Sequence, residues 1–421
     1  MQLDGKPRDA RRRPGIHHIG GDSLSKTGIA LAGGGPLGGI YEIGASVALA
    51  EAIDGFEFNQ ADIFVGVSSG GLIAAALANG INPARLARIL IDDGAEEIFD
   101  PEMLLRPAFG EYLSRIMSLP NLLVSSALSY LSDPFHHGLF ESFQRLSRAI
   151  PTGVFDNRGI DRVLHNLFSQ RGRTNDFRKL KHRLFLVATD LDSGESVSFG
   201  EEGFDDVPIS TAVQASAALP GLFPPVVING KHYVDGALIK TLNASVALKE
   251  GADIVFCINP LVPFDAELAA KRNIDERQNL NDGGLPVVLS QTFRAIIHSR
   301  MRLGMDRYKH QFPEADVLLF EPSRDDAEMF FTNVFSYRDR RRLCEHAYQR
   351  TRIDLYRRRH ELMPILKRHG LSLNLNVLKD HRYSLLPRPS HKSKVSLETT
   401  AHALDISLDE LQRWLESSRP A

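Results

Sequence analysis

The stretch Ile63-Phe64-Val65-Gly66-Val67-Ser68-Ser69-Gly70-Gly71 decides the fold, because a short apolar run passes there into a glycine-rich turn. The apolar run LIAAALA follows, and Asn79 and Gly80 then provide a helix stop. This order predicts a strand, a sharp turn and a helix. A serine at the tip of such a turn exposes its hydroxyl, so Ser68 is a candidate nucleophile.

The glycines around Ser68 fit this interpretation. Gly66 and Gly70 stand two positions before and after the serine, where the crowding of strand against helix admits only a hydrogen atom. Gly71 extends the small-residue turn. The positive end and free N–H groups of the following helix would favour an oxyanion at Ser68. The alternative is a small-residue turn that only allows the strand and helix to pack.

A second glycine-rich turn, Gly33-Gly34-Gly35-Pro36-Leu37-Gly38-Gly39, joins a predicted strand at 28–32 to a helical pattern at 40–53. Gly33, Gly35 and Gly38 fit the dinucleotide fingerprint G-x-G-x-x-G, a pattern that is weak alone. That fingerprint needs an acidic residue at the end of the next strand, and the sequence has Gly-Val-Ser there. A P-loop also fits poorly, because no Lys-Ser or Lys-Thr pair follows the glycines.

The remaining interpretation of this turn is an oxyanion-binding nest. Backbone N–H groups around Gly34 and Gly35 would hold the negative oxygen of a tetrahedral intermediate. Two neighbouring strand-turn-helix units would bring this nest close to Ser68.

The composition excludes several classes of protein. The chain has 421 residues and a formal charge of −2, with 43% hydrophobic and 24% charged residues, which is typical of a globular protein and not of a disordered or membrane-spanning one. The balanced charge gives no global basic footprint for nucleic acid, so no nucleic-acid partner is expected. The two cysteines, Cys257 and Cys344, cannot form a disulfide framework or a zinc site alone, which favours a reducing compartment.

Further strand candidates alternate with helical segments along the chain. This alternation predicts an α/β fold with a mostly parallel sheet that is covered on both faces. The candidates are residues 184–189, 225–228, 232–234, 253–259 and 317–321.

Ser68 requires a base, and two candidates lie close together in the sequence. His232 precedes Tyr233 and Val234, and a structural or surface role suits it better than catalysis. Asp235 ends the same predicted strand and is followed by Gly236, which would place its carboxylate at the edge of the sheet where α/β folds hold their sites. An ordinary turn aspartate is the alternative. Spacing alone leaves both interpretations of Asp235 open.

The blocks GGGPLGG, GVSSGG and DGA, at residues 33–39, 66–71 and 235–237, resemble in this order the three blocks of the patatin-like phospholipase family. The stretch ASAALPG at 215–221 also resembles the family's linker between the last two blocks. This resemblance covers about residues 27–259. It implies a three-layer α/β fold with a mostly parallel central sheet. The residue pattern, and not the resemblance, predicts a helical insertion and a helical C-terminal extension in addition.

The resemblance also implies a serine-aspartate dyad. Ser68 would attack an ester carbonyl and Asp235 would act as the base, with no histidine, metal or organic cofactor. The site glycines would be Gly33, Gly34, Gly35 and Gly38 in the oxyanion hole, and Gly66, Gly70, Gly71 and Gly236 as support. The family usually has a basic residue in the glycine block, where this chain has Leu37.

The dyad carries a physical condition. A free aspartate is a weak base with a pKa of about 3.9, so Asp235 is expected to be buried in a partly desolvated cleft that raises its pKa. The nearby Asp190-Leu191-Asp192-Ser193-Gly194 is expected to be a turn, because it lacks the glycine position and the final glutamate of a calcium loop.

The expected domain organisation has four parts. A basic tail at 1–26 precedes a hydrolase domain at 27–325, which contains a helical insertion at about 101–155. An arginine-rich helical extension follows at 326–380, and its helical segment at 338–369 is expected to be solvated. A linker with C-terminal helices ends the chain at 381–421.

The resemblance implies a lipid or phospholipid substrate. The cysteine usage, which favours a reducing compartment, predicts a cytoplasmic location. Arginines at 338–359 are candidates for peripheral contact with an anionic membrane. The alternative function is a non-catalytic regulatory or scaffold protein on the same fold, whose C-terminal helices bind a partner or DNA.

Overall fold

The computed structural model describes residues 25–91, 152–272, 280–331, 337–380 and 382–385. The predicted N-terminal tail, most of the predicted insertion at 101–155 and most of the predicted C-terminal helices lie outside the described residues.

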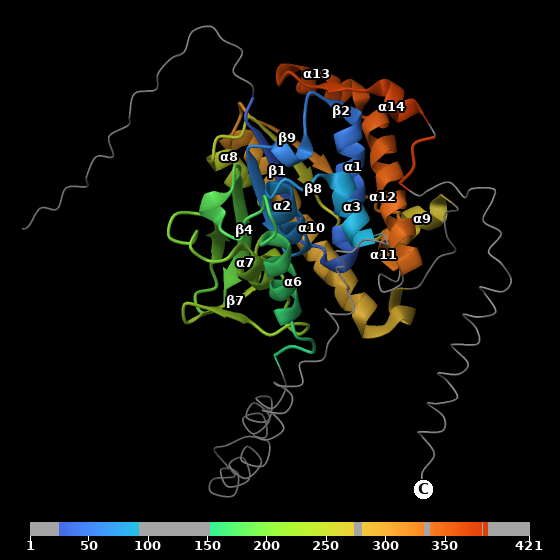
Figure 1. Cartoon of the computed structure of the whole chain (residues 1–421). Helices are drawn as coiled ribbons and strands as arrows, with labels where there is room; N and C mark the ends of the chain where they lie inside the picture. Colours follow the sequence, from blue (N-terminus) through green and yellow to red (C-terminus); the bar gives the residue numbers. More distant parts are fainter. Residues whose placement is uncertain (1–24, 92–151, 273–279, 332–336, 381, 386–421) are drawn as a thin grey trace, which may run out of the picture.

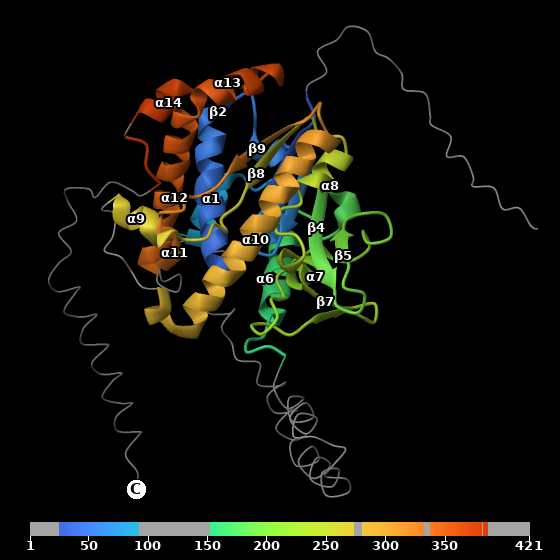
Figure 2. The same ribbon diagram turned by 180° about the vertical axis from the view of Figure 1, so that it is seen from behind.

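The described residues are built around one sheet with helices on both faces (Figures 1 and 2). Five neighbouring strands, β4-β3-β1-β8-β9, are parallel, and β5, β6 and β7 add antiparallel pairs at the β4 side. The strands are β1 (Thr27–Leu31), β3 (Ile63–Val67), β4 (Arg183–Asp190), β5 (Ser196–Phe199), β6 (Val226–Ile228), β7 (Lys231–Asp235), β8 (Ile254–Ile258) and β9 (Asp316–Phe320). The predicted α/β class with a mostly parallel central sheet is confirmed.

Alternate side chains of the buried strands face two apolar layers. Ile29 and Leu31 of β1 belong to one hydrophobic cluster, while Ala30 between them belongs to the other, as the twofold period of a strand requires. Helices α1, α2, α7 and α12 cover the first face, and α8 and α10 cover the second (Figure 2).

The helices are distributed along the whole described chain. They are α1 (Gly35–Ala52), α2 (Ser69–Ala78), α3 (Pro83–Ile91), α6 (Arg158–Phe168), α7 (Ile209–Ser216), α8 (Ala244–Lys249), α9 (Ala266–Lys271), α10 (Gly284–Gln311), α11 (Ala327–Phe331), α12 (Tyr337–Arg357), α13 (Arg359–Arg368) and α14 (Leu375–Lys379). Short strands β2 (Ile53–Asp54) and β10 (Ser372–Leu373) pair with each other.

The structure extends the predicted elements in two places. Helix α1 begins at Gly35 and not at residue 40, because Pro36 is tolerated in a first helical turn, where its missing N–H leaves no hydrogen bond unmade. Helix α10 was not predicted from the sequence, because its apolar side chains are partly exposed and its hydrophobic periodicity is therefore weak.

The interpretation of the arginine-rich segment as a solvated helix is wrong. Helix α12 packs along α1, and Leu343, Ala347 and Leu355 are fully buried in the same hydrophobic cluster as β1. Arg352 is also buried and donates to three backbone carbonyls. The long aliphatic stems of arginine permit such burial when the guanidinium finds acceptors. The predicted boundary at residue 325 stays a prediction.

None of the helices in the described ranges is long and apolar enough to cross a bilayer. Among the described residues, Cys257 and Cys344 are both buried and neither forms a disulfide.

Candidate active site

Ser68 lies at the tip of the turn between β3 and α2. Its backbone has φ 53° and ψ −123°, and Asn229 is the one other described non-glycine residue with a positive φ. Such a conformation costs on the order of 1–3 kcal/mol and persists where the surrounding structure enforces it. The serine side chain therefore projects from a strained turn at the N-terminus of α2, where the helix dipole favours negative charge.

The glycines flanking Ser68 are required by close packing. A Cβ atom on Gly66 would lie 2.5 Å from the Gly70 carbonyl oxygen, and one on Gly70 would lie 2.5 Å from the Ala32 carbonyl oxygen. Both distances are far inside van der Waals contact, so the predicted steric demand is confirmed. Gly71 differs, because a Cβ there would make only ordinary contacts at 3.5 Å.

The pairing of β4 brings Ser68 and Asp235 together. Val67 of β3 is aligned with Val187 of β4, and the next residue of β4, Ala188, is aligned with Asp235 of β7. Strand β4 thus pairs in parallel with β3 on one side and antiparallel with β7 on the other. This arrangement places Ser68, which follows β3, and Asp235, which ends β7, at the same end of the sheet.

Asp235 is 2% exposed, which confirms its predicted burial. Its carboxylate accepts the Ala237 amide at 2.8 Å. Burial raises the pKa of Asp235 to about 6, while hydrogen bonds from the Ala237 amide and the Ser68 side chain act in the opposite direction. Desolvation is the dominant cause. The carboxylate is therefore a stronger base than a free aspartate and stays ionised at neutral pH.

The glycine-rich turn before α1 lies directly beside these two residues. A Cβ on Gly33 would lie 2.9 Å from the Ala237 Cβ and 3.1 Å from the Ser68 Cβ. The turn, the serine and the Asp235 loop therefore converge on one place.

The amides of this turn are not equivalent. The Gly33 amide donates to the Thr241 carbonyl at 3.4 Å, and the Gly38 amide donates to the Gly34 carbonyl at 3.0 Å. Within the described part of the chain, the amides of Gly34 and Gly35 donate to no protein acceptor. Of the four glycines predicted for an oxyanion hole, Gly34 and Gly35 are thus the ones with free donors. Gly35 also needs to be glycine for its φ of +61°.

Ser216 is a supporting residue that the sequence analysis did not identify. Its hydroxyl accepts the Ser68 amide at 2.8 Å and donates to the Val187 carbonyl at 2.6 Å. The side chain is fully buried at the end of α7. It fixes the backbone of the strained turn to β4. Its place in the ASAALPG stretch was the available signal.

His232 and the turn at 190–194 lie away from this constellation. His232 is exposed, and its Nδ1 lies 3.3 Å from the Asp192 carboxylate. The prediction of a surface position is confirmed. Residues Asp190 to Gly194 contain the predicted turn, in which the Asp190 carboxylate accepts the Asp192 amide.

The family model for patatin-like phospholipase matches residues 29–248, which is more than half of the chain and includes both glycine-rich turns, Ser68 and Asp235. The chain belongs to the patatin-like phospholipase family. Its patatin-like fold is consistent with the mostly parallel sheet described above.

Three solved structures are similar to this patatin-like chain at low identity. VipD from Legionella pneumophila is 16% identical, with 78% of this chain and 66% of VipD covered and a TM-score of 0.35. The type III effector protein ExoU is 16% identical, with 80% and 53% covered and a TM-score of 0.34. Human GIVD cytosolic phospholipase A2 is 14% identical, with 61% and 44% covered and a TM-score of 0.27. The patatin-like chain thus covers from 44% to 66% of the length of these three proteins.

Proposed function

We propose that this patatin-like protein is a lipid acyl hydrolase that cleaves a carboxylic ester through an acyl intermediate on Ser68. The observation that carries the proposal is the convergence of the strained Ser68, the buried Asp235 and the free amides of Gly34 and Gly35 at one end of the sheet. The lipid class of the substrate comes from family membership.

The proposed reaction has two halves. The Ser68 hydroxyl attacks the ester carbonyl carbon and passes its proton to the Asp235 carboxylate, while the Gly34 and Gly35 amides hold the oxyanion. Collapse of this intermediate breaks the bond to the alcohol, which takes the proton from Asp235. Water then attacks the acyl-Ser68 ester and again gives a proton to Asp235. The second collapse returns that proton to Ser68 and releases the acid.

The pH dependence of the reaction follows from the pKa of Asp235 near 6. Only the ionised carboxylate accepts a proton, so kcat/KM should fall about tenfold per pH unit below this value and become constant above about pH 7. Stopped assays with a p-nitrophenyl ester from pH 4.5 to 8.5 measure this profile. A profile that is flat down to pH 4.5 would argue against Asp235 as the base.

The alternative of a non-catalytic scaffold depended largely on the C-terminal helices, which lie mainly outside the described residues. The strained Ser68 turn favours the hydrolase, because backbone strain of this kind clusters at active sites.

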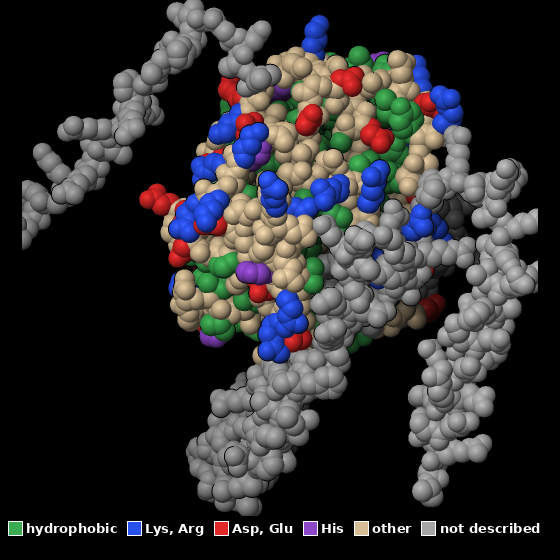
Figure 3. All heavy atoms as spheres, in the orientation of Figure 1, with side chains coloured by type: hydrophobic (Ala, Val, Ile, Leu, Met, Phe, Trp, Pro, Cys, Tyr) green, Lys and Arg blue, Asp and Glu red, His purple; other side chains and the backbone are tan. Residues whose placement is uncertain are grey.

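The arginines at 338–359 are poor candidates for a membrane-binding face. Arg340 and Arg352 are buried, Arg342 pairs with Glu328, and Arg358 pairs with Asp354. Figure 3 shows acidic side chains as well as basic ones on the visible face.

A better candidate for membrane contact is the exposed face of α10, which we propose to rest on a lipid bilayer. Its exposed apolar side chains recur at helical spacing along one side, and Arg300 lies on the same side by that spacing. Arg300 donates to the Leu238 carbonyl at 3.3 Å, three residues after Asp235, so this face adjoins the site. We call it the α10 stripe, and it comprises Leu285, Leu289, Phe293, Ile296 and Leu303.

Charge on the α10 stripe should weaken vesicle binding. The double change Leu289→Asp and Phe293→Asp removes two apolar groups, each worth about 1.5–3 kcal/mol when buried, so partitioning should fall at least tenfold. Co-sedimentation with phosphatidylcholine and phosphatidylglycerol vesicles measures it. Ile353→Asp, on an exposed residue of α12, is the matched control. Unchanged partitioning of the double variant would contradict the proposal. If the parent protein is instead a dimer without vesicles and the double variant is a monomer, the α10 stripe binds a second copy of the chain and not a bilayer.

A further inference from the structure

The loop that follows β8 packs against the glycine-rich turn before α1. Pro260, in this loop, is buried. A Cβ atom on Gly34 would lie 2.6 Å from the Pro260 Cγ, and one on Gly38 would lie 2.8 Å from the same atom. The proline ring therefore lies directly against the backbone of Gly34 and Gly38, on either side of Gly35. We call residues 259–264 the β8 loop.

Asn259 fixes the start of the β8 loop. Its side chain is fully buried, and its Oδ1 atom accepts the Leu261 amide at 3.1 Å. This hydrogen bond closes an Asx turn around Pro260. The Nδ2 atom of Asn259 also donates to the Glu321 carboxylate at 3.3 Å, and its backbone amide donates to the Phe320 carbonyl at 2.9 Å. The residue before Pro260 is thus tied to the end of β9.

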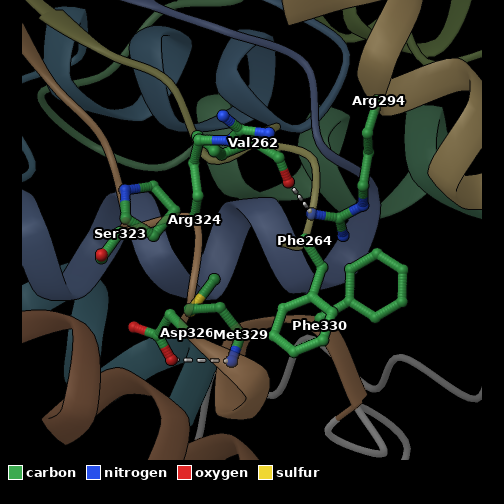
Figure 4. A pocket seen from close by; sticks show the side chains of 9 residues that line it. Val262, Phe264, Arg294, Ser323, Arg324, Asp326, Met329 and Phe330 are labelled. Carbon is green, nitrogen blue, oxygen red and sulfur yellow. Dashed lines mark hydrogen bonds between the residues drawn. The ribbon is translucent and has the colours of Figure 1, made fainter. Parts of the chain in front are cut away.

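Helix α10 fixes the end of the β8 loop. Gln291 pairs with the backbone of Phe264, because its Oε1 accepts the Phe264 amide at 3.1 Å and its Nε2 donates to the Phe264 carbonyl at 2.7 Å. The buried Arg294 donates through Nη1 to the Val262 carbonyl at 3.3 Å, and Figure 4 shows its guanidinium directed toward that carbonyl. The β8 loop is therefore anchored on both sides of Pro260.

The chemistry of proline suits it to this contact. Its φ is restricted to about −65°, and its ring cannot swing away as a flexible side chain can. The glycines opposite it have no Cβ atom, so their backbone has more conformational freedom than that of other residues. An oxyanion hole lowers the reaction barrier only when its donors are held in place before the reaction. A stiff ring against a glycine backbone can provide this restraint.

We propose that Pro260 is a positioning residue, which holds the free Gly34 and Gly35 amides in the orientation that binds the oxyanion. This role rests on the proposed function, because it requires a tetrahedral intermediate on Ser68. Pro260 acts through the backbone of the turn, so its loss should weaken the stabilisation of the transition state more than the binding of the substrate.

The first experiment measures this effect in the kinetics. Pro260→Ala should lower kcat at least tenfold for a p-nitrophenyl ester, while KM changes less than twofold. The inhibition constant of a trifluoromethyl ketone, which forms a tetrahedral adduct with the Ser68 hydroxyl, should rise by the same factor as kcat falls. Pro260→Val keeps two γ-carbons and should recover most of kcat.

Pro322→Ala is the matched control. Pro322 is also buried, and it lies two residues after the end of β9, as Pro260 lies two residues after the end of β8. Both substitutions remove buried carbon atoms, so both should lower the melting temperature. Only Pro260→Ala should change kcat and the affinity for the ketone.

The second experiment tests the contact independently of hydrolysis. The amides of Gly33 and Gly38 are hydrogen-bonded and report on the turn by hydrogen exchange. In the full-length Ser68→Ala protein, the additional change Pro260→Ala should speed deuterium uptake at these amides at least about fivefold. Pro322→Ala should leave this rate within about twofold, and equal rates in all three proteins would show that Pro260 does not hold the turn.

Two kinetic results would overturn the proposal. One is near-normal kcat in a folded Pro260→Ala protein, and the other is an equal loss of kcat in Pro322→Ala, which would assign the effect to general loosening. If Pro260→Ala does not fold, Asn259→Asp carries the comparison, because it places a second carboxylate beside Glu321 and should lower kcat with little change in KM. If the parent protein hydrolyses no ester, the proposed function fails, while hydrogen exchange still decides whether Pro260 holds the turn.

Discussion

Replacement of Ser68 by alanine is expected to lower ester hydrolysis at least about a thousandfold while leaving the fold intact. The hydroxyl is the nucleophile of the proposed reaction, and removal of a nucleophile leaves only the contribution of binding and of the oxyanion donors. Ser68 makes its fixing hydrogen bond through its backbone amide, which alanine retains. Hydrolysis of a long-chain p-nitrophenyl ester measures the loss, and circular dichroism checks the fold.

Asp235→Asn should cause a loss of similar size, because the amide cannot accept the proton. Asparagine keeps an oxygen for the Ala237 amide, so the loop should persist. The raised pKa of Asp235, about 6, means that the folded state favours the protonated acid. As the pH rises from about 4 to 6, the Asp235 carboxyl ionises more readily in the unfolded chain than in the folded one. The free energy of unfolding therefore falls over this range, by an amount on the order of 3 kcal/mol in total.

The Asp235→Asn protein should consequently be inactive yet more heat-stable than the parent at pH 8. His232→Ala is the matched control, because this exposed histidine lies on the same strand and should be dispensable. Strong loss of activity in His232→Ala, or near-normal turnover in Asp235→Asn, would contradict the dyad.

Gly33→Ala is expected to lower kcat/KM about a hundredfold or more. The added Cβ would lie 2.9 Å from the Ala237 Cβ and 3.1 Å from the Ser68 Cβ, so it must push apart the two loops that hold the dyad. A displacement of about 1 Å in a reacting group is enough for a loss of this size.

Gly39→Ala is the matched control for this change. Gly39 belongs to the same glycine-rich block, in the first turns of α1, but a Cβ there would meet its nearest neighbour, the Ser69 Cβ, at an ordinary 3.5 Å. Its activity should stay within about threefold of the parent. Equal losses in both variants would mean that the glycine block acts only through general packing.

The local part of the site could be predicted from the sequence. The strand, turn and helix around Ser68 leave their signals within a few adjacent residues, and the crowding at Gly66 and Gly70 follows from that geometry. The same holds for the sheet, because alternating strands and helices specify a parallel α/β arrangement.

The non-local part could not be derived from residue patterns alone. Asp235 reaches Ser68 because β4 pairs with β3 on one side and β7 on the other, and no local pattern specifies this order. Spacing left Asp235 open as a turn aspartate, and the family resemblance selected it. The ASAALPG stretch marked the region of Ser216, but no local pattern specifies the hydrogen bond of its hydroxyl with the distant Ser68 amide.

The arginine-rich segment shows the limit of composition as a guide. Its charge indicated a solvated helix, yet the apolar residues between the arginines pack α12 against α1. Conversely, α10 exposes apolar side chains along one side, which weakens the periodic signal that identifies a helix.

The central claim is that Ser68 is activated by Asp235. Labelling of the intact protein with a fluorophosphonate, followed by peptide mass mapping, tests it most directly, because this reagent modifies an activated serine and spares an inert one. We predict one adduct on Ser68 that is lost in Ser68→Ala, strongly slowed in Asp235→Asn and unchanged in His232→Ala. A folded protein whose Ser68 stays unlabelled, or is labelled equally fast in Asp235→Asn, would contradict the claim.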